Sequence, residues 1–405
     1  MNITLKRYLY VVNGFIILLV LGIGYAWSVF VGPLENHYGW GRAQTSLAFT
    51  ILMISFALGN LMTGILSRKI PHKRIVQISS VAMGGGMFLT SMVSSIQLLY
   101  FTYSIAVGLS IGMVYNAVVS ITPRWFPEKQ GTITGVLLMA YALSASILGP
   151  VCQFMLARIG VPFTFVTLAI IDFLVLFVGS FNLVAPTTKQ KELLPQAAAR
   201  KKNEGIKTEI NHWQMLRSKE FYIYFILTVF FISIALSYLN HVVPALENDL
   251  LLSAETAALV VSAMSISNGL ARPVFGVFYD KTGLTLSLTT LSFIYIFATW
   301  TTYFGLWSRT TSLMIIGACG VLFGFGGQGA LMPTITRNLF GEKNFSMNFS
   351  IVSLVGIVGS VGPSIIGIIQ AAHGNYQLAY LMLAIATVIP AILIQLLLFF
   401  IKRRK

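Results

Sequence analysis

The chain has 405 residues, of which 56% are hydrophobic and only 10% are charged. Soluble domains carry about a quarter charged residues, so the composition excludes a soluble globular protein and predicts an integral membrane protein. The formal net charge of +15 would also suit a nucleic-acid-binding protein. The positive residues are distributed by loop rather than gathered on one face, so we expect no nucleic-acid partner.

Apolar stretches recur along the whole chain, and each is long enough to cross a bilayer, which takes about 20 residues. Spans in lipid must be helical because every backbone polar group needs an internal partner. The predicted spans cover residues 10–33, 42–67, 75–95, 98–122, 131–156, 162–184, 221–246, 254–279, 284–306, 312–336, 346–371 and 376–401. The sequence therefore predicts an all-α membrane protein with twelve transmembrane helices.

One long polar connection divides these spans into six and six. We expect an N-terminal six-helix bundle over residues 1–184, a basic cytoplasmic linker over residues 185–220 and a C-terminal six-helix bundle over residues 221–405. Within the linker, an amphipathic surface helix is expected around His212–Leu216. The other connections are short, which is typical of a compact helical bundle.

Lys and Arg are sorted between alternate loops. With a cytoplasmic N-terminus, all 27 of them fall in cytoplasmic segments except Arg42, Arg158, Arg272 and Arg309. This asymmetry follows the positive-inside rule. It predicts that both termini are cytoplasmic and that the protein is a multi-pass component of the plasma membrane; we expect it to be a monomer in the lipid bilayer.

The two halves repeat a short motif after corresponding spans. Residues 64–69 (GILSRK) follow the second span as residues 276–281 (GVFYDK) follow the eighth, and residues 126–129 (FPEK) follow the fourth span as residues 340–343 (FGEK) follow the tenth. On this repeat, Asn60 corresponds to Arg272. Two six-helix repeats predict a pseudo-symmetric transporter whose site lies between the halves near the membrane midplane.

This pattern resembles the major facilitator superfamily over the whole chain. Residues 276–283 (GVFYDKTG) match the loop motif of that superfamily, which implies a conformational role for its matching positions: Gly276, Asp280, Lys281 and Gly283. The first-half copy departs from the motif, since Arg68 stands where an Asp belongs and Pro71 where a Gly belongs. The resemblance therefore does not imply the usual charge relay in the first half.

Within the superfamily, the chain is similar to the oxalate/formate antiporter family and its monocarboxylate-transporter relatives. The resemblance is carried by residues 24–28 (GYAWS), Tyr115, residues 124–131 (RWFPEKQG), residues 135–141, Arg272, and residues 325–327 (FGG) with Pro333. It implies a secondary transporter that works by alternating access without a cofactor.

An enzyme is not expected, because the sequence carries no metal-ligand cluster, nucleophile–base set or nucleotide-binding motif. The glycine-rich residues 84–86 and 324–329 lack the strand–loop–helix context and the Lys-Ser/Thr of a phosphate-binding loop. We expect these runs to serve close helix packing.

Arg272 is the one Lys or Arg that this prediction places at membrane depth. A guanidinium stays charged in proteins and costs at least about 2.5 kcal/mol in hydrocarbon. Its planar fork can donate two parallel hydrogen bonds to a carboxylate, so we hypothesise that it binds an anionic substrate; the alternative is a structural Arg that pairs within the bundle. Asn268, one helical turn earlier on the same face, could donate to the substrate, orient the guanidinium, or bond to another helix.

The family resemblance implies further pocket residues. Tyr25, Tyr115 and Tyr141 match pocket tyrosines of the oxalate/formate family, and a phenol offers a donor together with an aromatic wall. Phe325 and Trp27 are candidates for the apolar part of the wall. Each of these side chains could equally be a packing residue.

The resemblance also bears on the substrate's charge. The oxalate carrier of this family has a Lys on its eleventh helix, and by alignment Gly356 stands there, with Gly329 and Ser353 replacing an aromatic Tyr and Trp. One cation neutralises one carboxylate, and a second would be desolvated without a partner. The sequence therefore favours a monocarboxylate such as lactate, pyruvate or formate.

Two titratable residues within the spans are candidates for coupling or gating. Asp172 lies in the middle of the sixth span and His241 near the outer end of the seventh. An acid at membrane depth is a functional hypothesis by default, and His titrates near physiological pH; each could also be a satisfied structural residue. Proton symport and anion exchange both stay open.

Two other functions are carried beside the carboxylate transporter. One is a proton-driven exporter of drugs or other amphiphiles, which would depend weakly on Arg272. The other is a membrane sensor that binds an anion without moving it. Movement of labelled substrate by reconstituted protein distinguishes the sensor from both carriers.

The charge sorting makes a direct prediction about topology. Tags inserted near Arg200 and at the C-terminus should both be cytoplasmic, because the loops that flank them are basic. Protease protection of tagged protein in sealed vesicles checks this. Tags on opposite sides of the membrane would refute the count of twelve spans.

Overall fold

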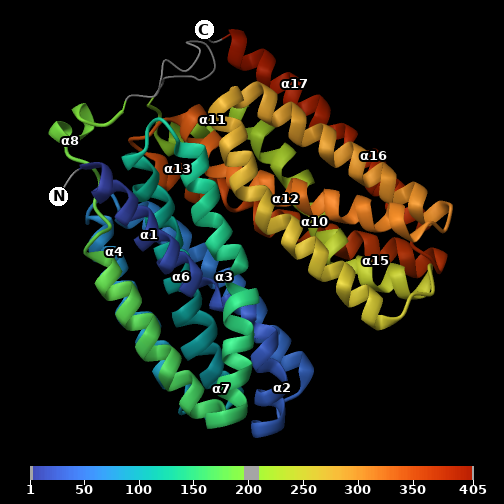
Figure 1. Ribbon diagram of the computed structural model, residues 1–405, viewed down its shortest axis with the longest axis horizontal. Coiled ribbons are helices and arrows are strands. Elements are labelled where there is room, and N and C mark those ends of the chain that lie inside the picture. Colours follow the sequence, from blue (N-terminus) through green and yellow to red (C-terminus); the bar gives the residue numbers. More distant parts are fainter. Residues whose placement is uncertain (1–2, 196–208, 404–405) are drawn as a thin grey trace. The chain divides into compact units, whose positions relative to one another are not determined.

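The computed structural model describes residues 3–195 and 209–403, and every regular element in these ranges is a helix (Figure 1). The all-α prediction is therefore confirmed. The middle of the predicted linker, including Arg200, and the last two residues of the basic tail lie outside the described residues.

The chain divides into two compact units. The first comprises Met1–Ala198 together with Phe345–Ser353, and the second comprises Ala199–Asn344 together with Leu354–Lys405. The predicted C-terminal bundle included residues 345–353, which in the structure group with the first unit.

In the first unit, the helices follow the chain in short connections. They are α1 (Ile3–Leu21), the 3-10 helix η1 (Gly22–Ala26), α2 (Trp27–Tyr38), α3 (Arg42–Leu66), α4 (His72–Thr90), α5 (Ile96–Leu99), the π-helix η2 (Tyr100–Val107), α6 (Gly108–Ile121), the 3-10 helix η3 (Thr122–Trp125), α7 (Gln130–Ser180), α8 (Thr188–Glu192) and α13 (Phe345–Val352). The second unit contains α9 (His212–Leu216), α10 (Lys219–Asn248), α11 (Ala254–Trp307), α12 (Thr311–Phe340), α14 (Val355–Gly359), α15 (Val361–His373), α16 (Gln377–Ala386) and α17 (Val388–Arg403).

Nine helical stretches in the described part of the chain are long and apolar enough to cross a membrane. Two of them, α7 and α11, each cover two predicted spans. Each of these helices is broken between its two spans by a glycine with positive φ: Gly160 at φ 74° and Gly283 at φ 82°. A left-handed φ of this kind favours glycine. With these breaks and the 19-residue α4, the chain has about twelve membrane helices.

Several spans that the sequence predicts as continuous are interrupted. The first span changes to 3-10 geometry at η1, the fourth to π geometry at η2, and the eleventh is divided into α13, α14 and α15. Helix irregularities gather at glycine and proline. The first and eleventh spans fit this, since η1 contains Gly22 and Gly24 and α15 begins Val361-Gly362-Pro363.

Glycines set the closest helix contacts in the first unit. A Cβ on Gly59 of α3 would lie 2.0 Å from the Leu109 carbonyl oxygen, and one on Gly112 of α6 would lie 2.0 Å from the Phe56 carbonyl oxygen. Helices α3 and α6 therefore touch backbone to backbone, as small residues permit in membrane bundles.

The predicted role of the glycine-rich runs is seen in both units. A Cβ on Gly84 would lie 2.8 Å from Cβ of Phe173 on α7, and one on Gly86 would lie 2.7 Å from the Thr102 carbonyl oxygen. In α12, Gly326 meets Asn268 and Gly327 meets the Phe275 ring of α11 in the same way. Gly84, Gly86, Gly326 and Gly327 are therefore helix contacts, whereas Gly85 and Gly329 of the same runs are not.

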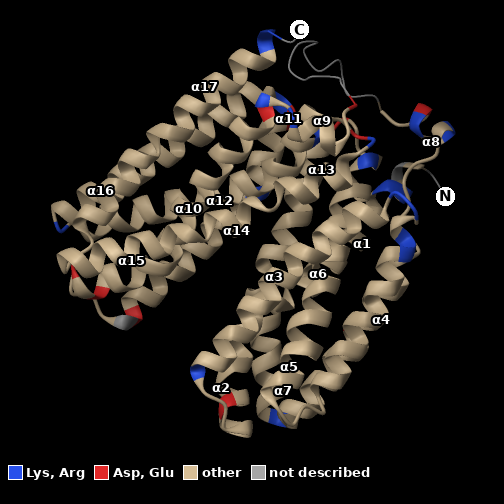
Figure 2. Ribbon diagram, turned by 180° about the vertical axis from the view of Figure 1, so that it is seen from behind, with Lys and Arg blue, Asp and Glu red and all other residues tan. Residues whose placement is uncertain are grey.

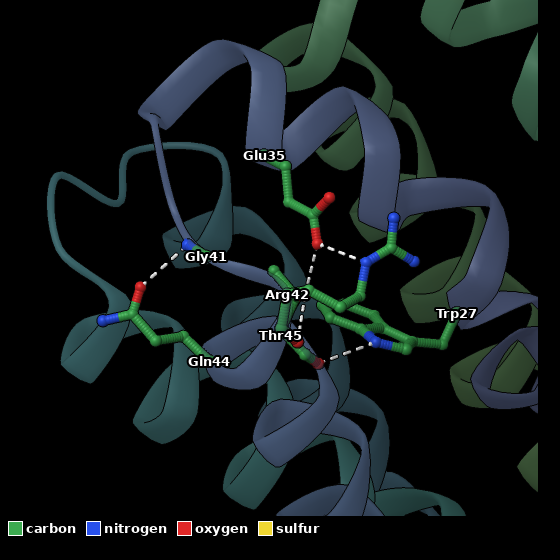
Figure 3. A network of polar contacts seen from close by, with 6 residues as sticks. All are labelled: Trp27, Glu35, Gly41, Arg42, Gln44 and Thr45. Atoms are coloured by element: carbon green, nitrogen blue, oxygen red, sulfur yellow. Dashed lines mark hydrogen bonds and ion pairs between the residues drawn. The ribbon is translucent and has the colours of Figure 1, made fainter.

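Charged residues lie mainly at the helix ends of each unit, while the helices are otherwise nearly free of them (Figure 2). At the connection from α2 to α3, Glu35 accepts hydrogen bonds from Arg42 at 3.0 Å and from Thr45 at 2.7 Å, and the Trp27 indole donates to the Thr45 carbonyl oxygen at 3.1 Å (Figure 3). This network fixes the two helix ends to each other.

The repeated Phe-x-Glu-Lys motif holds an ion pair in each unit. Glu128 pairs with Arg7, whose Nε also donates to the Trp125 carbonyl oxygen at 2.7 Å, and Glu342 pairs with Arg337 at 2.9 Å. Both arginines are buried. A buried guanidinium is stable only with such partners, so the repeat conserves the ion pair although the arginines come from different positions.

The end of the linker is fastened to the second unit. The Glu209 carboxylate accepts hydrogen bonds from the backbone amides of Glu342 at 3.1 Å and Lys343 at 2.7 Å, and Asn344 donates to the Ile210 carbonyl oxygen. Helix α9 covers the residues where the sequence predicts a surface helix. It buries Met215 and exposes Trp213, as an amphipathic helix does.

The contact between α3 and α6 predicts the effect of one methyl group. Gly112→Ala should lower the unfolding temperature in detergent, because relieving such a clash costs about 1–3 kcal/mol. Gly85→Ala on α4 is the matched control, since a Cβ there meets nothing within 4 Å. The packing account would be wrong if both variants unfolded at the wild-type temperature.

Candidate functional site

Three tyrosines predicted from the family resemblance come together in the first unit. The Tyr141 ring of α7 lies 5.0 Å from the Tyr25 ring of η1 and 5.2 Å from the Tyr115 ring of α6, between ring centroids. Phe56 of α3 lies 5.5 Å from Tyr115, and Phe349 of α13 lies 6.3 Å from it. We call these five residues the aromatic cluster.

The cluster passes from a buried to an exposed side. Tyr141 is 5% exposed, Tyr115 is half-buried, and Tyr25 is 45% exposed. Pairs of aromatic rings at such distances stabilise one another, so the cluster presents a fixed apolar wall edged with phenols. No motif in the sequence predicted Phe56 as a member of the cluster. Phe56 lies one helical turn before Gly59 on α3, and its place in the cluster follows from the packing of α3 on α6.

In the second unit, Arg272 lies in the first arm of α11 and is half-buried. Asn268, one turn earlier, is also half-buried. A Cβ built on Gly326 of α12 would lie 2.8 Å from the Asn268 Oδ1. That oxygen is buried and accepts no hydrogen bond from the described residues. The close approach of α12 at Gly326 therefore holds the Asn268 side chain in place beside the Arg272 turn.

Open space occurs at two glycines of the second unit. A Cβ on Gly329 of α12 or on Gly356 of α14 would meet no atom of the described residues within 4 Å. These are two of the positions where the resemblance implied larger side chains in the oxalate carrier. Phe325, the predicted apolar wall residue on α12, is half-buried.

The predicted conformational motif lies where α11 breaks. Gly276 is buried, Asp280 is half-buried and Lys281 is exposed. Gly283 supplies the left-handed φ that ends the first arm. In the first unit the corresponding connection is made differently: α3 ends at Leu66, and Pro71, at φ −66°, precedes the first residue of α4.

His241 of α10 is held by two partners of the second unit. Its Nε2 lies 2.8 Å from the Pro363 carbonyl oxygen of α15, and its Nδ1 lies 3.3 Å from the hydroxyl of Tyr376, which precedes α16. Both ring nitrogens are therefore satisfied. The His241 ring therefore links α10 to α15 and to the residue that precedes α16.

Asp172 of α7 is buried, with 1% of its surface exposed. It does not lie in the aromatic cluster; its ionisable neighbours are Tyr103 of η2 and Cys152 of α7. The predicted coupling candidates Asp172 and His241 therefore lie in different units.

His72 stands at the start of α4, before the third predicted span. Burial, aided by the positive charge of Arg124, lowers the pKa of His72 to about 4. The imidazole is therefore neutral throughout the physiological range, and it contributes no pH response there.

A buried amide cluster was not anticipated by the sequence. The Asn116 Nδ2 of α6 donates to Oδ1 of Asn60 at 2.6 Å and to Oγ of Ser350 at 2.8 Å, and its Oδ1 accepts from Ser120 at 2.9 Å and Ser346 at 2.7 Å. Asn60, the repeat counterpart of Arg272, thus serves an interhelical hydrogen-bond network. The signal for it in the sequence was the presence of these five polar residues, Asn60, Asn116, Ser120, Ser346 and Ser350, in or next to otherwise apolar spans.

The comparisons with known proteins agree with this architecture. The family model for the Major Facilitator Superfamily matches residues 14–339 and, in a second match, residues 225–405. The chain is 26% identical to the uncharacterized MFS-type transporter YhjX of Escherichia coli, over 89% of this chain and 87% of that protein.

Two further relatives are named transporters of organic acids. The chain is 24% identical to the oxalate:formate antiporter of Oxalobacter formigenes, over 95% of this chain and 90% of that one. It is also 24% identical to human monocarboxylate transporter 10, over 73% of this chain and 58% of that one.

Solved structures share the fold at low identity. The fucose transporter FucP in its outward conformation matches with a TM-score of 0.71 at 12% identity, covering 97% of this chain and 99% of that one. The proton:xylose symporter XylE matches with a TM-score of 0.72 at 12% identity, covering 97% of this chain and 96% of that one. The chain therefore belongs to the Major Facilitator Superfamily, whose members are secondary transporters and not enzymes.

Proposed function

We propose that this protein carries a small monocarboxylate, such as lactate, pyruvate or formate, by alternating access coupled to proton symport or to anion exchange. The observation that carries the proposal is Arg272, a permanent cation in the middle of a predicted span. The named functions of two relatives, an oxalate:formate antiporter and a monocarboxylate transporter, support a carboxylate as the substrate class.

The role proposed for Arg272 is that of the substrate's counter-ion. A carboxylate that leaves water needs a charged partner with hydrogen bonds, and the guanidinium fork supplies both. Asn268 is proposed to position that fork or to donate to the same carboxylate. Its fixed place against Gly326 suits such a role, because a pre-organised polar group loses less entropy on binding.

The proposed valence follows from the number of cations. The sequence has no Lys or Arg between Lys343 and Lys402, and Gly356 faces open space. A dicarboxylate would bring a second negative charge, and leaving that charge desolvated without a partner is costly. We therefore assign the protein a substrate with one carboxylate.

The aromatic cluster is proposed to contact the apolar part of the substrate. Tyr25 is its exposed member, while Tyr141 and Phe56 hold the rings in place. Phenol hydroxyls beside an apolar wall suit a short, partly apolar acid. Phe325 is proposed as a further wall residue. The same proposal places the protein in the plasma membrane with both termini in the cytoplasm.

Substitution of Arg272 tests the assignment. Arg272→Gln should abolish saturable uptake of labelled lactate or formate by proteoliposomes, because removing one member of a buried charge pair costs about 2–5 kcal/mol, or about 30-fold or more in affinity. Arg272→Lys keeps the charge but loses the fork, so uptake should fall about tenfold with normal folding.

The matched control is Arg158→Gln, which removes an exposed arginine of the first unit. A structural Arg272 would give a different pattern, in which yield and monodispersity fall before uptake does. Normal saturable uptake by folded Arg272→Gln protein would contradict the proposal.

Binding of the acid without any uptake by the wild type would favour the sensor, and uptake of unrelated amphiphiles would favour the exporter.

Substitution of Gly356 tests the valence. Gly356→Lys should raise the preference for oxalate over formate about tenfold, because a charged hydrogen bond contributes about 1.5–3 kcal/mol. The side chain has room, since a Cβ there meets nothing within 4 Å. Gly356→Met controls for length without charge. Competition of each acid against labelled formate measures the ratio, and tight oxalate binding by the wild type would refute the single-cation argument.

A further inference from the structure

Asp172 is a buried acid without a counter-charge. It is 1% exposed in the second arm of α7, its Oδ2 has no hydrogen-bond partner among the described residues, and none of the Lys, Arg or His residues in that part of the chain pairs with it. Other acids of the same unit are compensated: Glu35 by Arg42 and Thr45 (Figure 3), and Glu128 by Arg7. Asp172 therefore differs in kind from the acids at the helix ends.

The surroundings of Asp172 contain a second polar atom without a partner. Tyr103 of η2 is fully buried and lies close enough to Asp172 for electrostatic interaction, and its hydroxyl makes no hydrogen bond within the described residues. The Tyr103 ring is fixed by Trp27, at 4.7 Å between centroids, and by Phe165, at 6.1 Å. Two buried polar groups without a hydrogen-bond partner among the described residues thus lie near each other in one buried enclosure of the first unit.

The backbone around this enclosure is irregular on one side and tightly packed on the other. Tyr103 belongs to a π-helical stretch, a geometry that recurs at functional sites. On α4, Gly84 lies against Phe173 and Ala169, the neighbours of Asp172 along α7. The charged side chains of α4, Lys73 and Arg74, lie at its start, about 15 Å or more along the helix from Gly84. This contact with α4 therefore brings no counter-charge to Asp172.

A proton is the partner that fits. An isolated carboxylate at this burial is costly, whereas the neutral acid is not. We propose that Asp172 is the transporter's proton-binding site, separate from the anion-binding residues, with Tyr103 as its positioning residue. The carboxyl O–H can donate to the Tyr103 hydroxyl, and the phenol can in turn donate to the second carboxyl oxygen once the proton has left.

The proton balance is simple. A proton from water on one side forms the O–H bond on Asp172, and that bond breaks when the proton passes to water on the other side. This inference rests on the proposed function, which supplies the coupled substrate, a monocarboxylate. One proton moving with one monocarboxylate transfers no net charge. Of the two coupling modes in the proposed function, proton symport and anion exchange, the inference selects proton symport.

Other titratable groups near Asp172 do not compete for this role. Cys152 is the other ionisable neighbour. The remaining ionisable residues of α7 and of the helices packed on it are not among the ionisable neighbours of Asp172: Tyr141 and Arg158 of α7; Lys6, Arg7, Tyr8 and Tyr10 of α1; Tyr25 of η1; Arg124 of η3; Glu35, His37 and Tyr38 of α2; and His72, Lys73 and Arg74 of α4. His72 is about 18 Å along the helix from Gly84 and is neutral at physiological pH.

The first test needs no substrate. Infrared spectra of purified protein should show a protonated carboxyl C=O band at neutral pH that disappears in Asp172→Asn and loses intensity at high pH. Tyr103→Phe should shift the frequency of that band, because it removes the proposed acceptor of the carboxyl O–H hydrogen bond. Ser180→Ala is the control on the same helix, since its hydroxyl donates to the Phe177 carbonyl oxygen within that helix. Absence of an Asp172-dependent band at neutral pH would overturn the proposal.

The second test measures coupling in proteoliposomes loaded with a pH-sensitive dye. With one-to-one coupling, a pH difference of about 1 unit should drive about tenfold accumulation of labelled lactate by the wild type. Asp172→Asn mimics the protonated acid, so it should keep counterflow exchange of lactate but lose accumulation and dye-detected proton entry. Full accumulation by Asp172→Asn, or loss of coupling in His241→Gln alone, would overturn the proposal.

Two outcomes separate this inference from the proposed function. If the wild type moves lactate, formate and acetate at no measurable rate, the monocarboxylate assignment fails, and the infrared titration alone decides the proton site. If Asp172→Asn does not fold, Tyr103→Phe carries the test: a pH profile of uptake that moves without a change in counterflow supports the proposal, and an unmoved profile contradicts it.

Discussion

The free-energy cost of placing a charge in hydrocarbon determines where charged residues occur along this chain. It confines Lys and Arg to loops and helix ends, where buried arginines such as Arg7 and Arg337 have carboxylate partners. The same cost makes the two exceptions informative. Arg272 cannot lose its charge and must meet an anion or another polar partner, whereas Asp172 can take up a proton. In the proposed function, Arg272 supplies the permanent cation and Asp172 the neutralisable acid for coupled transport of an acid anion.

The two units use a common architecture for different tasks. Both contain helices packed through glycines, a break at a glycine with positive φ, and an Arg–Glu pair at the repeated motif. The residues proposed for function differ between them. The second unit carries Arg272 and residues 276–283, while the first carries the aromatic cluster, Asp172 and the amide network around Asn116. At the position of Arg272 the first unit has Asn60, which bonds within that network and stabilises helix contacts.

Much of the fold could be predicted from the sequence because membrane helices are governed by one-dimensional rules: length, apolarity and loop charge. The helix at His212–Leu216 and the role of the glycine runs followed in the same way. Interruptions such as η1 and η2 could not be predicted, since they depend on how neighbouring helices pack. The meeting of Tyr25, Tyr115 and Tyr141 was expected only through family resemblance. Phe56, the Asn116 network and the nearness of Tyr103 to Asp172 depend on the packing of spans far apart in sequence.

The central claim is that Arg272 holds the carboxylate of a singly charged substrate. Isothermal titration of lactate, formate and oxalate into monodisperse wild-type and Arg272→Gln protein in detergent tests it most directly, because binding is measured without the transport cycle. The account predicts saturable binding of a monocarboxylate to the wild type, weaker binding of oxalate, and loss of both in folded Arg272→Gln protein. Wild-type affinity for the monocarboxylate in that variant would contradict the account.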